Sequence, residues 1–270
     1  MAAPDPGPVL NIPLFTPEQR ARLRTRLLDY VASDSRVSGA AITGSAAAER
    51  EDRWSDIDLA FGVADFADLQ TVLSDWTAYM YEQHLALHHC DVRSGAWIYR
   101  VFLLPDTLQV DLAFAPAAEF RALTPTLRLV SGRAMEPSHA PPPAPADIIG
   151  LGWLYALHAR SSIARRNLWQ AEYMISGVRD HALALASIRH DLPANHGRGI
   201  DRLPGEVTAP FEGSLVRRLE TDELSRAFQV AVDGLLREIQ CVDQALAGRL
   251  EATLRSLSDT SRESSASRHD

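Results

Sequence analysis

The residues with the clearest chemical meaning are a Gly-Ser pair and two aspartates that follow it after a ten-residue spacer. Gly44 and Ser45 open the segment GSAAAEREDRWSDID, which ends on Asp56 and Asp58. Alternate residues of a β-strand point to the same face, so Asp56 and Asp58 share one face if SDIDLAF is a strand. Two neighbouring carboxylates repel each other unless a cation lies between them. A hard divalent ion with oxygen ligands, Mg2+ above all, removes this conflict.

Gly44 and Ser45 have the properties of a phosphate-binding turn. They follow the apolar run VSGAAIT, which predicts a strand over residues 37–43. Glycine lets the backbone turn and approach a phosphate closely, and serine offers a hydroxyl and an N–H to phosphate oxygens. A third aspartate, Asp111, lies between apolar neighbours in the strand-like run LQVDLAF. A phosphate-binding turn together with paired carboxylates predicts nucleotide chemistry.

These residues resemble the signature of the polymerase-beta-type nucleotidyltransferase superfamily, in which Gly-Ser precedes Asp-x-Asp by ten residues and a third acidic residue follows on a strand. The resemblance implies that Asp56 and Asp58 hold the metal ion that bridges the phosphates of the nucleotide. It implies that Asp111 either joins them at a second metal ion or accepts the proton of the attacking hydroxyl. It also implies that Gly44 and Ser45 bind the nucleotide.

The ten-residue spacer departs from the family pattern at one point. Family members commonly carry Arg-Gly there, whereas this chain has Ala48-Glu49. A glutamate near a triphosphate is unfavourable, so the departure bears on nucleotide binding. The wider pattern resembles the small antibiotic nucleotidyltransferases, which transfer AMP to a hydroxyl of an aminoglycoside or lincosamide. That likeness implies ATP as co-substrate, two Mg2+ ions as cofactors and a role in antibiotic resistance.

The charge and composition of the 270-residue chain restrict its partners. The formal net charge is −8, and no lysine occurs, so all 27 fixed side-chain cations are arginines. This balance disfavours a large nucleic acid as partner and favours a cationic small molecule. A triphosphate clamp must therefore use arginine, backbone N–H groups or hydroxyls.

Other sequence features indicate a cytoplasmic protein that is not bound to a membrane. No apolar run is long enough to cross a membrane, and the first residues lack the basic and apolar regions of a secretory signal. The two cysteines, Cys90 and Cys241, are far apart in the chain, which fits reduced thiols better than a disulfide framework.

The order of the patterns predicts an α/β (α+β) catalytic domain with a mixed, largely antiparallel sheet, followed by an all-α helical domain. Thr16, Asp65 and Asp147 are the expected N-caps of three helices, and three strand-like runs with turn residues between them predict an antiparallel meander. Clustered prolines mark an extended linker. The expected boundaries are 1–135 for the nucleotidyltransferase domain, 136–146 for the linker, 147–252 for the helical domain that binds substrate or nucleotide, and 253–270 for a disordered tail.

A second stripe of residues accompanies the apolar stripe of the long helix expected after the linker. It consists of Arg165, Trp169, Glu172, Ser176 and Arg179. If this face lines the site, Arg179 meets the phosphates of the nucleotide, whereas Trp169 and Glu172 meet the acceptor, with Glu172 also a candidate base. The alternative is a solvated helix face with charge pairs.

Two further segments are interpreted as structural. His88, His89 and Cys90 are consecutive, and strand neighbours point to opposite faces, so they do not converge on one metal ion. The segment 198–202 carries two arginines and is interpreted as a surface loop, with a nucleotide-covering loop as the alternative.

Three hypotheses on function follow. The first is an ATP- and Mg2+-dependent nucleotidyltransferase acting on a small hydroxylated, cationic acceptor, with pyrophosphate as the second product. The second is a nucleotidyltransferase that modifies a protein, as in toxin–antitoxin pairs. The third is a nucleotide-binding module without catalysis. The sequence leaves open the choice of nucleotide, the acceptor and the oligomeric state.

Overall fold

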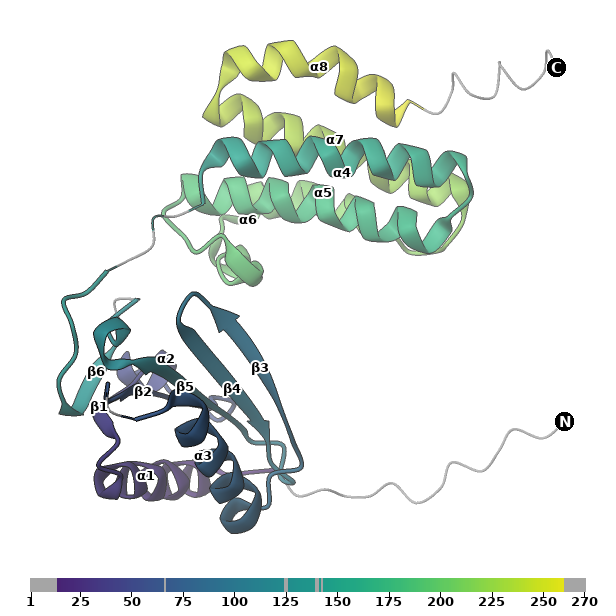
Figure 1. The fold of residues 1–270 in the computed structure, drawn as a ribbon. Helices are drawn as coiled ribbons and strands as arrows, with labels where there is room; N and C mark the ends of the chain where they lie inside the picture. Colours follow the sequence, from purple (N-terminus) through teal and green to yellow (C-terminus); the bar gives the residue numbers. More distant parts are fainter. Residues whose placement is uncertain (1–13, 66, 124–125, 139–140, 142, 260–270) are drawn as a thin grey trace, which may run out of the picture. The chain divides into compact units, whose positions relative to one another are not determined.

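The protein consists of an α/β unit followed by a helical unit (Figure 1). The computed structural model describes residues 14–65, 67–123, 126–138, 141 and 143–259. Its two compact units comprise residues 1–140 and 141–270. The first contains a six-stranded mixed sheet, and the described residues of the second form helices and no strand, which confirms the predicted fold class. Among the described helices, none is long and apolar enough to cross a membrane.

The sheet of the first unit has the strand order β3-β4-β5-β2-β1-β6. Its central strands β2 and β5 are parallel, whereas every other neighbouring pair is antiparallel. The predicted meander of three strands is confirmed as β3, β4 and β5. The strands are β1 (Val37–Ile42), β2 (Ile57–Val63), β3 (His88–Ser94), β4 (Trp97–Leu103), β5 (Gln109–Pro116) and β6 (Arg128–Gly132).

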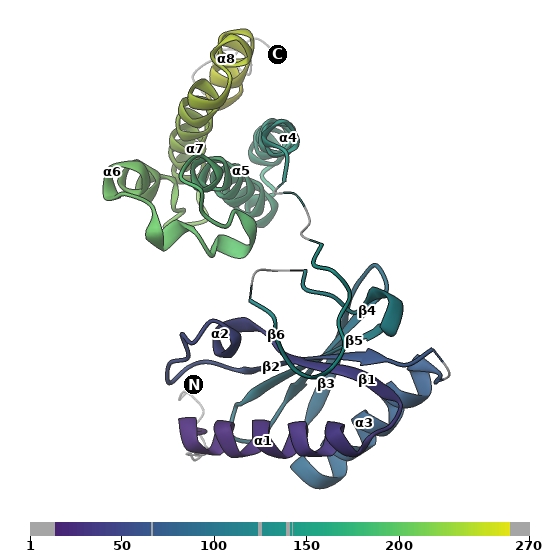
Figure 2. The ribbon, with the colours of Figure 1, turned by 90° about the vertical axis from the view of Figure 1, so that its left-hand side faces the viewer.

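Two long helices, α1 (Pro17–Ser33) and α3 (Leu69–His84), cover one face of the sheet (Figure 2). Thr16 caps α1 as predicted, because its hydroxyl accepts the Gln19 N–H while the Gln19 side chain accepts the Thr16 N–H. The core between helices and sheet includes the fully buried Leu27 and Trp76. The remaining short helices of this unit are α2 (Gly44–Ala47) and a 3-10 turn at Ala117–Glu119.

The other face of the sheet is lined by small side chains. Ala60 and Ala113 are buried there with Phe120, whose ring lies over Gly39 and Gly62. A Cβ at either glycine would overlap the Phe120 ring, so these positions need glycine. The face is therefore flat along its middle strands.

The second unit is a bundle whose core is formed by four long helices. Its buried residues include Ile175, Val178, Phe228 and Leu235. The helices are α4 (Pro145–Ala164), α5 (Leu168–Arg189), α6 (Gly205–Thr208), α7 (Thr221–Val242) and α8 (Gln244–Ser258), with 3-10 turns at Asn195–Gly197, Ile200–Arg202 and Ala209–Ser214.

Several expected boundaries differ from the structure. Asp68, not Asp65, caps α3, because its carboxylate accepts the Thr71 N–H at 2.8 Å. Helix α4 starts at Pro145, inside the expected linker, so Asp147 lies in its first turn instead of capping it. Proline is suited to this first position because its φ is already helical.

The C-terminal end of the fold also differs. Helix α8 runs to Ser258, beyond the expected start of the tail at residue 253, because Leu254 and Leu257 are buried against the bundle. The last part of the expected tail, residues 260–270, lies outside the described residues.

Candidate active site

Two of the predicted acids are neighbours across the central strands. Asp58 of β2 pairs in register with Asp111 of β5. Paired residues of parallel strands project to the same face, so the two carboxylates lie side by side. The residues beside them, such as Ile57 and Leu112, are fully buried on the helix-covered face. Burial of these apolar neighbours therefore directs both acids to the small-residue face.

Asp111 is the most strongly perturbed of the acids. Burial, and secondly the nearby charge of Asp56, raise the pKa of its carboxyl from 3.8 to about 6. Among the described residues, its buried Oδ1 has no hydrogen-bond partner. A buried oxygen without a partner is costly, and such groups are found at functional sites.

Asp56 directly precedes β2 and is tied to the neighbouring strand. Gln109 Nε2 donates to Asp56 Oδ2 at 3.2 Å. Gln109 lies two residues before Asp111 in β5, so the two share one face. Sequence analysis missed Gln109, although its two-residue offset from Asp111 was a usable signal.

Tyr99 is a second residue that the sequence analysis missed. It lies opposite Ala113 in β4, diagonal to Asp111 on the same face. Burial and the charge of Asp111 raise the pKa of its phenol. Its ring stacks on Trp97, with ring centroids 5.9 Å apart. The pair borders the acids on the side away from β2.

Gly44 and Ser45 adjoin the same acids. Gly44 has a φ of +61°, and a Cβ there would overlap the Asp58 carboxylate, so only glycine fits. The Thr43 N–H donates to the Asp58 carbonyl at 3.1 Å, which holds the turn on β2. Among the described residues, the buried Ser45 Oγ has no hydrogen-bond partner. The turn thus brings a hydroxyl and a close backbone approach to the acid pair.

The ten-residue spacer has a left-handed residue at its unusual position. Glu49 adopts a φ of +54°, a conformation that costs a residue with a Cβ about 1–2 kcal/mol. A glycine would adopt it without that cost. Glu49 therefore replaces the glycine of the family pattern with a larger side chain. Its backbone nevertheless has the left-handed conformation that glycine adopts most easily.

The oxygen-only set of Asp56, Asp58 and Asp111 fits a hard divalent ion in its chemistry. The partnerless Asp111 Oδ1 and the influence of Asp56 on its pKa show carboxylates in mutual repulsion, which a cation would relieve. As the side chains lie, however, no three His, Cys, Asp or Glu groups in the described parts of the chain converge on one point. Coordination by all three requires the side chains to turn, so their roles as metal ligands stay predictions.

The expected acceptor and nucleotide residues of the long helix lie in the second unit. Trp169 is 78% exposed, and Glu172 accepts a hydrogen bond from Ser176 Oγ at 2.8 Å. Arg179 Nη2 pairs with Asp180 Oδ1 at 3.2 Å. Arg165 is not part of this helix, because α4 ends at Ala164 and α5 begins at Leu168.

Two tyrosines that the sequence analysis missed lie beside this stripe. Tyr173, four residues after Trp169, is exposed. Its ring centroid lies 6.3 Å from that of Tyr155 in α4, and a hydrogen bond between the phenols raises the pKa of Tyr155. The exposed side chains of α5 therefore include the aromatic rings of Trp169 and Tyr173.

The interpretation of His88, His89 and Cys90 as structural agrees with the strand register. His89 lies opposite Phe102, and Cys90 lies opposite Val101. The Nδ1 of His89 is hydrogen-bonded with the Tyr81 hydroxyl at 3.0 Å. Neighbouring side chains thus project to opposite faces of the sheet.

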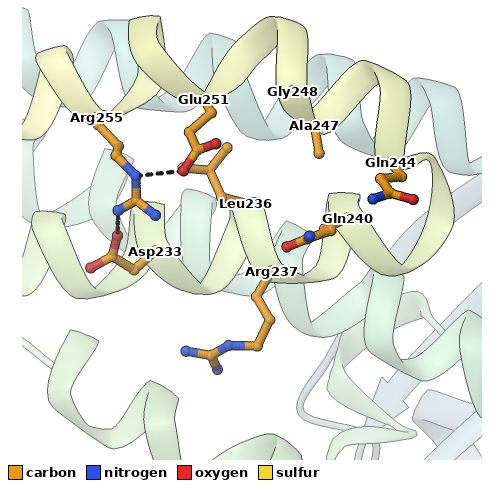
Figure 3. Close-up of a pocket in the computed structure, with 9 residues that line it drawn as sticks. All are labelled: Asp233, Leu236, Arg237, Gln240, Gln244, Ala247, Gly248, Glu251 and Arg255. Atoms are coloured by element: carbon orange, nitrogen blue, oxygen red, sulfur yellow. Dashed lines mark hydrogen bonds and ion pairs between the residues drawn. The ribbon is translucent and has the colours of Figure 1, made fainter.

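A hollow of about 580 Å³ lies between α7 and α8 in the second unit (Figure 3). At one end Arg255 pairs with both Asp233 and Glu251, so its charges are already compensated. Gln240 and Gln244 line the other end. This hollow contains none of the predicted site residues.

Comparisons with known proteins give a likeness in structure and none in sequence. No protein-family model matches the chain, and no curated protein matches it in sequence. Among solved structures, the chain is similar to an aminoglycoside 6-adenyltransferase from Bacillus subtilis. The identity is 12%, the TM-score is 0.39, and the match covers 87% of this chain and 96% of that one.

The raised pKa of Asp111 predicts a pH-dependent stability in the presence of a chelator. Between pH 3.8 and about 6 the folded carboxyl keeps a proton that the unfolded one releases, so stability falls as pH rises through this window. A shift of about two pKa units corresponds to about 3 kcal/mol. Urea unfolding from pH 4 to 8 should show this loss in the wild type and not in Asp111→Asn. The exposed Asp29→Asn is the control, and equal pH dependence in both variants would contradict the prediction.

The left-handed Glu49 predicts a stabilising substitution. Glu49→Gly removes the steric cost at φ +54°, and the gain should be about 1 kcal/mol after the greater flexibility of the unfolded glycine is subtracted. Thermal and urea unfolding measure it. Glu82→Gly in α3, where φ is helical, should instead lose about 1 kcal/mol. A loss of stability in Glu49→Gly would refute the argument.

Proposed function

We propose that this protein is a metal-dependent nucleotidyltransferase that moves AMP from ATP to a hydroxyl of a small molecule and releases pyrophosphate. The observation that carries the proposal is the pairing of Asp58 with Asp111, with the Gly44 turn packed against the Asp58 carboxylate. Phosphate-binding groups and clustered carboxylates are the parts that phosphoryl transfer needs, because catalysis consists of positioning and charge neutralisation.

The two residues of the turn are proposed to bind the nucleotide. Gly44 permits close approach of the backbone, and the Ser45 hydroxyl, which lacks a partner among the described residues, is available to a phosphate oxygen. Asp56 and Asp58 are proposed to hold Mg2+, and Asp111 beside them is either a ligand to a second ion or the acceptor of the hydroxyl proton. When bound, Mg2+ would neutralise phosphate charge.

Asp111 has the properties of the proton acceptor. A pKa of about 6 leaves its carboxylate ionised at neutral pH, yet basic enough to take a proton. In the proposed reaction the acceptor oxygen attacks the α-phosphorus, and the bond from that phosphorus to the bridging oxygen of pyrophosphate breaks. The hydroxyl proton passes to Asp111.

The acceptor is proposed to be cationic and polyhydroxylated, as aminoglycosides are. The exposed Trp169 and Tyr173 offer aromatic faces, which attract cations, and Glu172 adds a carboxylate. The net charge of −8 steers cations towards the protein. Glu172 and Trp169 are thus assigned to acceptor binding, and Arg179 to the nucleotide.

A cytoplasmic location is part of the proposal. Cys90 and Cys241 are both exposed and free, which fits a compartment that keeps thiols reduced.

The proposed chemistry predicts that Asp56→Asn and Asp58→Asn each abolish pyrophosphate release. Loss of a ligand that neutralises phosphate charge costs several kcal/mol, or about 1000-fold in rate. The assay supplies ATP and Mg2+ with a panel of aminoglycosides, lincosamides and other polyhydroxylated compounds. Asp29→Asn should retain full activity.

Activity that persists in either variant would refute the acid pair as the metal site. If the wild type binds ATP but no compound on the panel releases pyrophosphate, the small-molecule acceptor is wrong, and a protein acceptor or a non-catalytic module replaces it.

The stripe on α5 predicts separable effects on the two substrates. Trp169→Ala should raise the KM for a cationic acceptor about fivefold, since a cation–π contact contributes about 1 kcal/mol. Arg179→Ala should raise the KM for ATP by a similar factor. Steady-state kinetics measure both, with the exposed Arg249→Ala of α8 as control. If neither KM changes in either variant, this face of α5 is a solvated helix face and not a substrate-binding one.

A further inference from the structure

Arg20 of α1 is a buried arginine outside the acidic motif. It is only 4% exposed. Its Nη1 donates to two backbone carbonyls of the ten-residue spacer, those of Asp52 at 2.7 Å and Ser55 at 2.8 Å. These carbonyls lie 32 and 35 residues further along the chain, so no local sequence pattern predicts the contacts.

The charge of Arg20 is compensated by the spacer itself. Its Nε lies 3.1 Å from Glu51 Oε1, and Arg24 Nη1 lies 2.6 Å from the same oxygen. A buried cation is tolerated only when it is paired and hydrogen-bonded. Arg20 and Arg24 thus share one acidic partner, but only Arg20 also contacts the Asp52 and Ser55 carbonyls.

The spacer segment next to Arg20 is closed by its own hydrogen bonds. Asp52 Oδ1 accepts the Trp54 N–H at 2.8 Å, and the Asp52 N–H donates to Ser55 Oγ at 2.9 Å. Trp54 is left 69% exposed. The Ser55 carbonyl that Arg20 binds belongs to the peptide group that enters Asp56. Arg20 therefore contacts the peptide group that leads directly into Asp56.

We propose that Arg20 is a positioning residue for Asp56, acting through the Ser55 carbonyl. This inference rests on the proposed function, because it assigns Asp56 a role in metal and nucleotide binding. Loss of the two hydrogen bonds frees the 52–55 turn while leaving the sheet pairing of β2 intact. The effect falls on Mg2+ use and turnover more than on ATP affinity, which the Gly44 turn supplies.

The test compares Arg20→Met with Arg24→Met. Both substitutions remove a guanidinium from Glu51, and only the first removes the carbonyl contacts. In Arg20→Met we expect kcat to fall and the Mg2+ concentration for half activity to rise, each about 10- to 100-fold, as for other groups that orient metal ligands. KM for ATP should change less than about threefold, and Arg24→Met should stay within about twofold of wild type in every constant.

One readout does not depend on turnover. Hydrogen exchange of the peptide covering residues 52–56 reports the order of the turn directly. We expect faster exchange, by about tenfold or more, in Arg20→Met and no change in Arg24→Met. If the wild type shows no turnover with any acceptor, the proposed function fails, whereas the exchange result still decides whether Arg20 orders the turn.

Arg20→Lys keeps a buried cation in case the methionine variant does not fold. A shorter side chain with one nitrogen should restore Tm to near wild type and leave the Mg2+ requirement raised. A lowered Tm with unchanged kcat, unchanged Mg2+ dependence and unchanged exchange of residues 52–56 would overturn the proposal. It would leave Arg20 as a stabilising residue only.

Discussion

The in-register parallel pairing of β2 with β5 is the constraint on which the candidate site depends. Apolar residues at alternate positions, Ile57 and Leu59 in β2 and Leu112 in β5, pack against α1 and α3. Their burial forces the intervening aspartates to the opposite face, side by side. A slip of one residue in either strand would move an acid into the hydrophobic core. The energy that stabilises the core therefore also positions the acids.

This arrangement places an electrostatic cost at the centre of the sheet. Asp111 is half-buried near Asp56, and its pKa rises because burial and that neighbouring charge disfavour the carboxylate. Its Oδ1 has no hydrogen-bond partner among the described residues. Ala60 and Ala113 line the same face, where the Trp97 ring stacks on Tyr99. Such a cost is tolerated where the same groups have a chemical use, and a hard cation is the ligand that would relieve it.

The loops around the acids are shaped by backbone geometry as much as by side-chain type. Gly44 is required because a Cβ would overlap Asp58, whereas Glu49 occupies a left-handed position that glycine would adopt more easily. The part of the spacer that follows Glu49 is anchored by Arg20 of α1, which donates to the carbonyls of Asp52 and Ser55. The motif is thus held both by its own strand β2 and by a helix that precedes it in the chain.

The sequence alone determined the fold class, the antiparallel meander and the Thr16 cap, because local periodicity and capping are encoded in neighbouring residues. Motif spacing is encoded in the same way, and it determined the positions of Gly44, Ser45, Asp56, Asp58 and Asp111. Strand partners and long-range hydrogen bonds are not local. Only the tertiary structure decided that Asp58 pairs with Asp111, that Gln109 holds Asp56 and that Arg20 anchors the spacer. It also decided the extent of α8, since Leu254 and Leu257 are helical where the bundle buries them. Burial and pairing depend on residues distant in the chain, and these interactions determined where each acid lies.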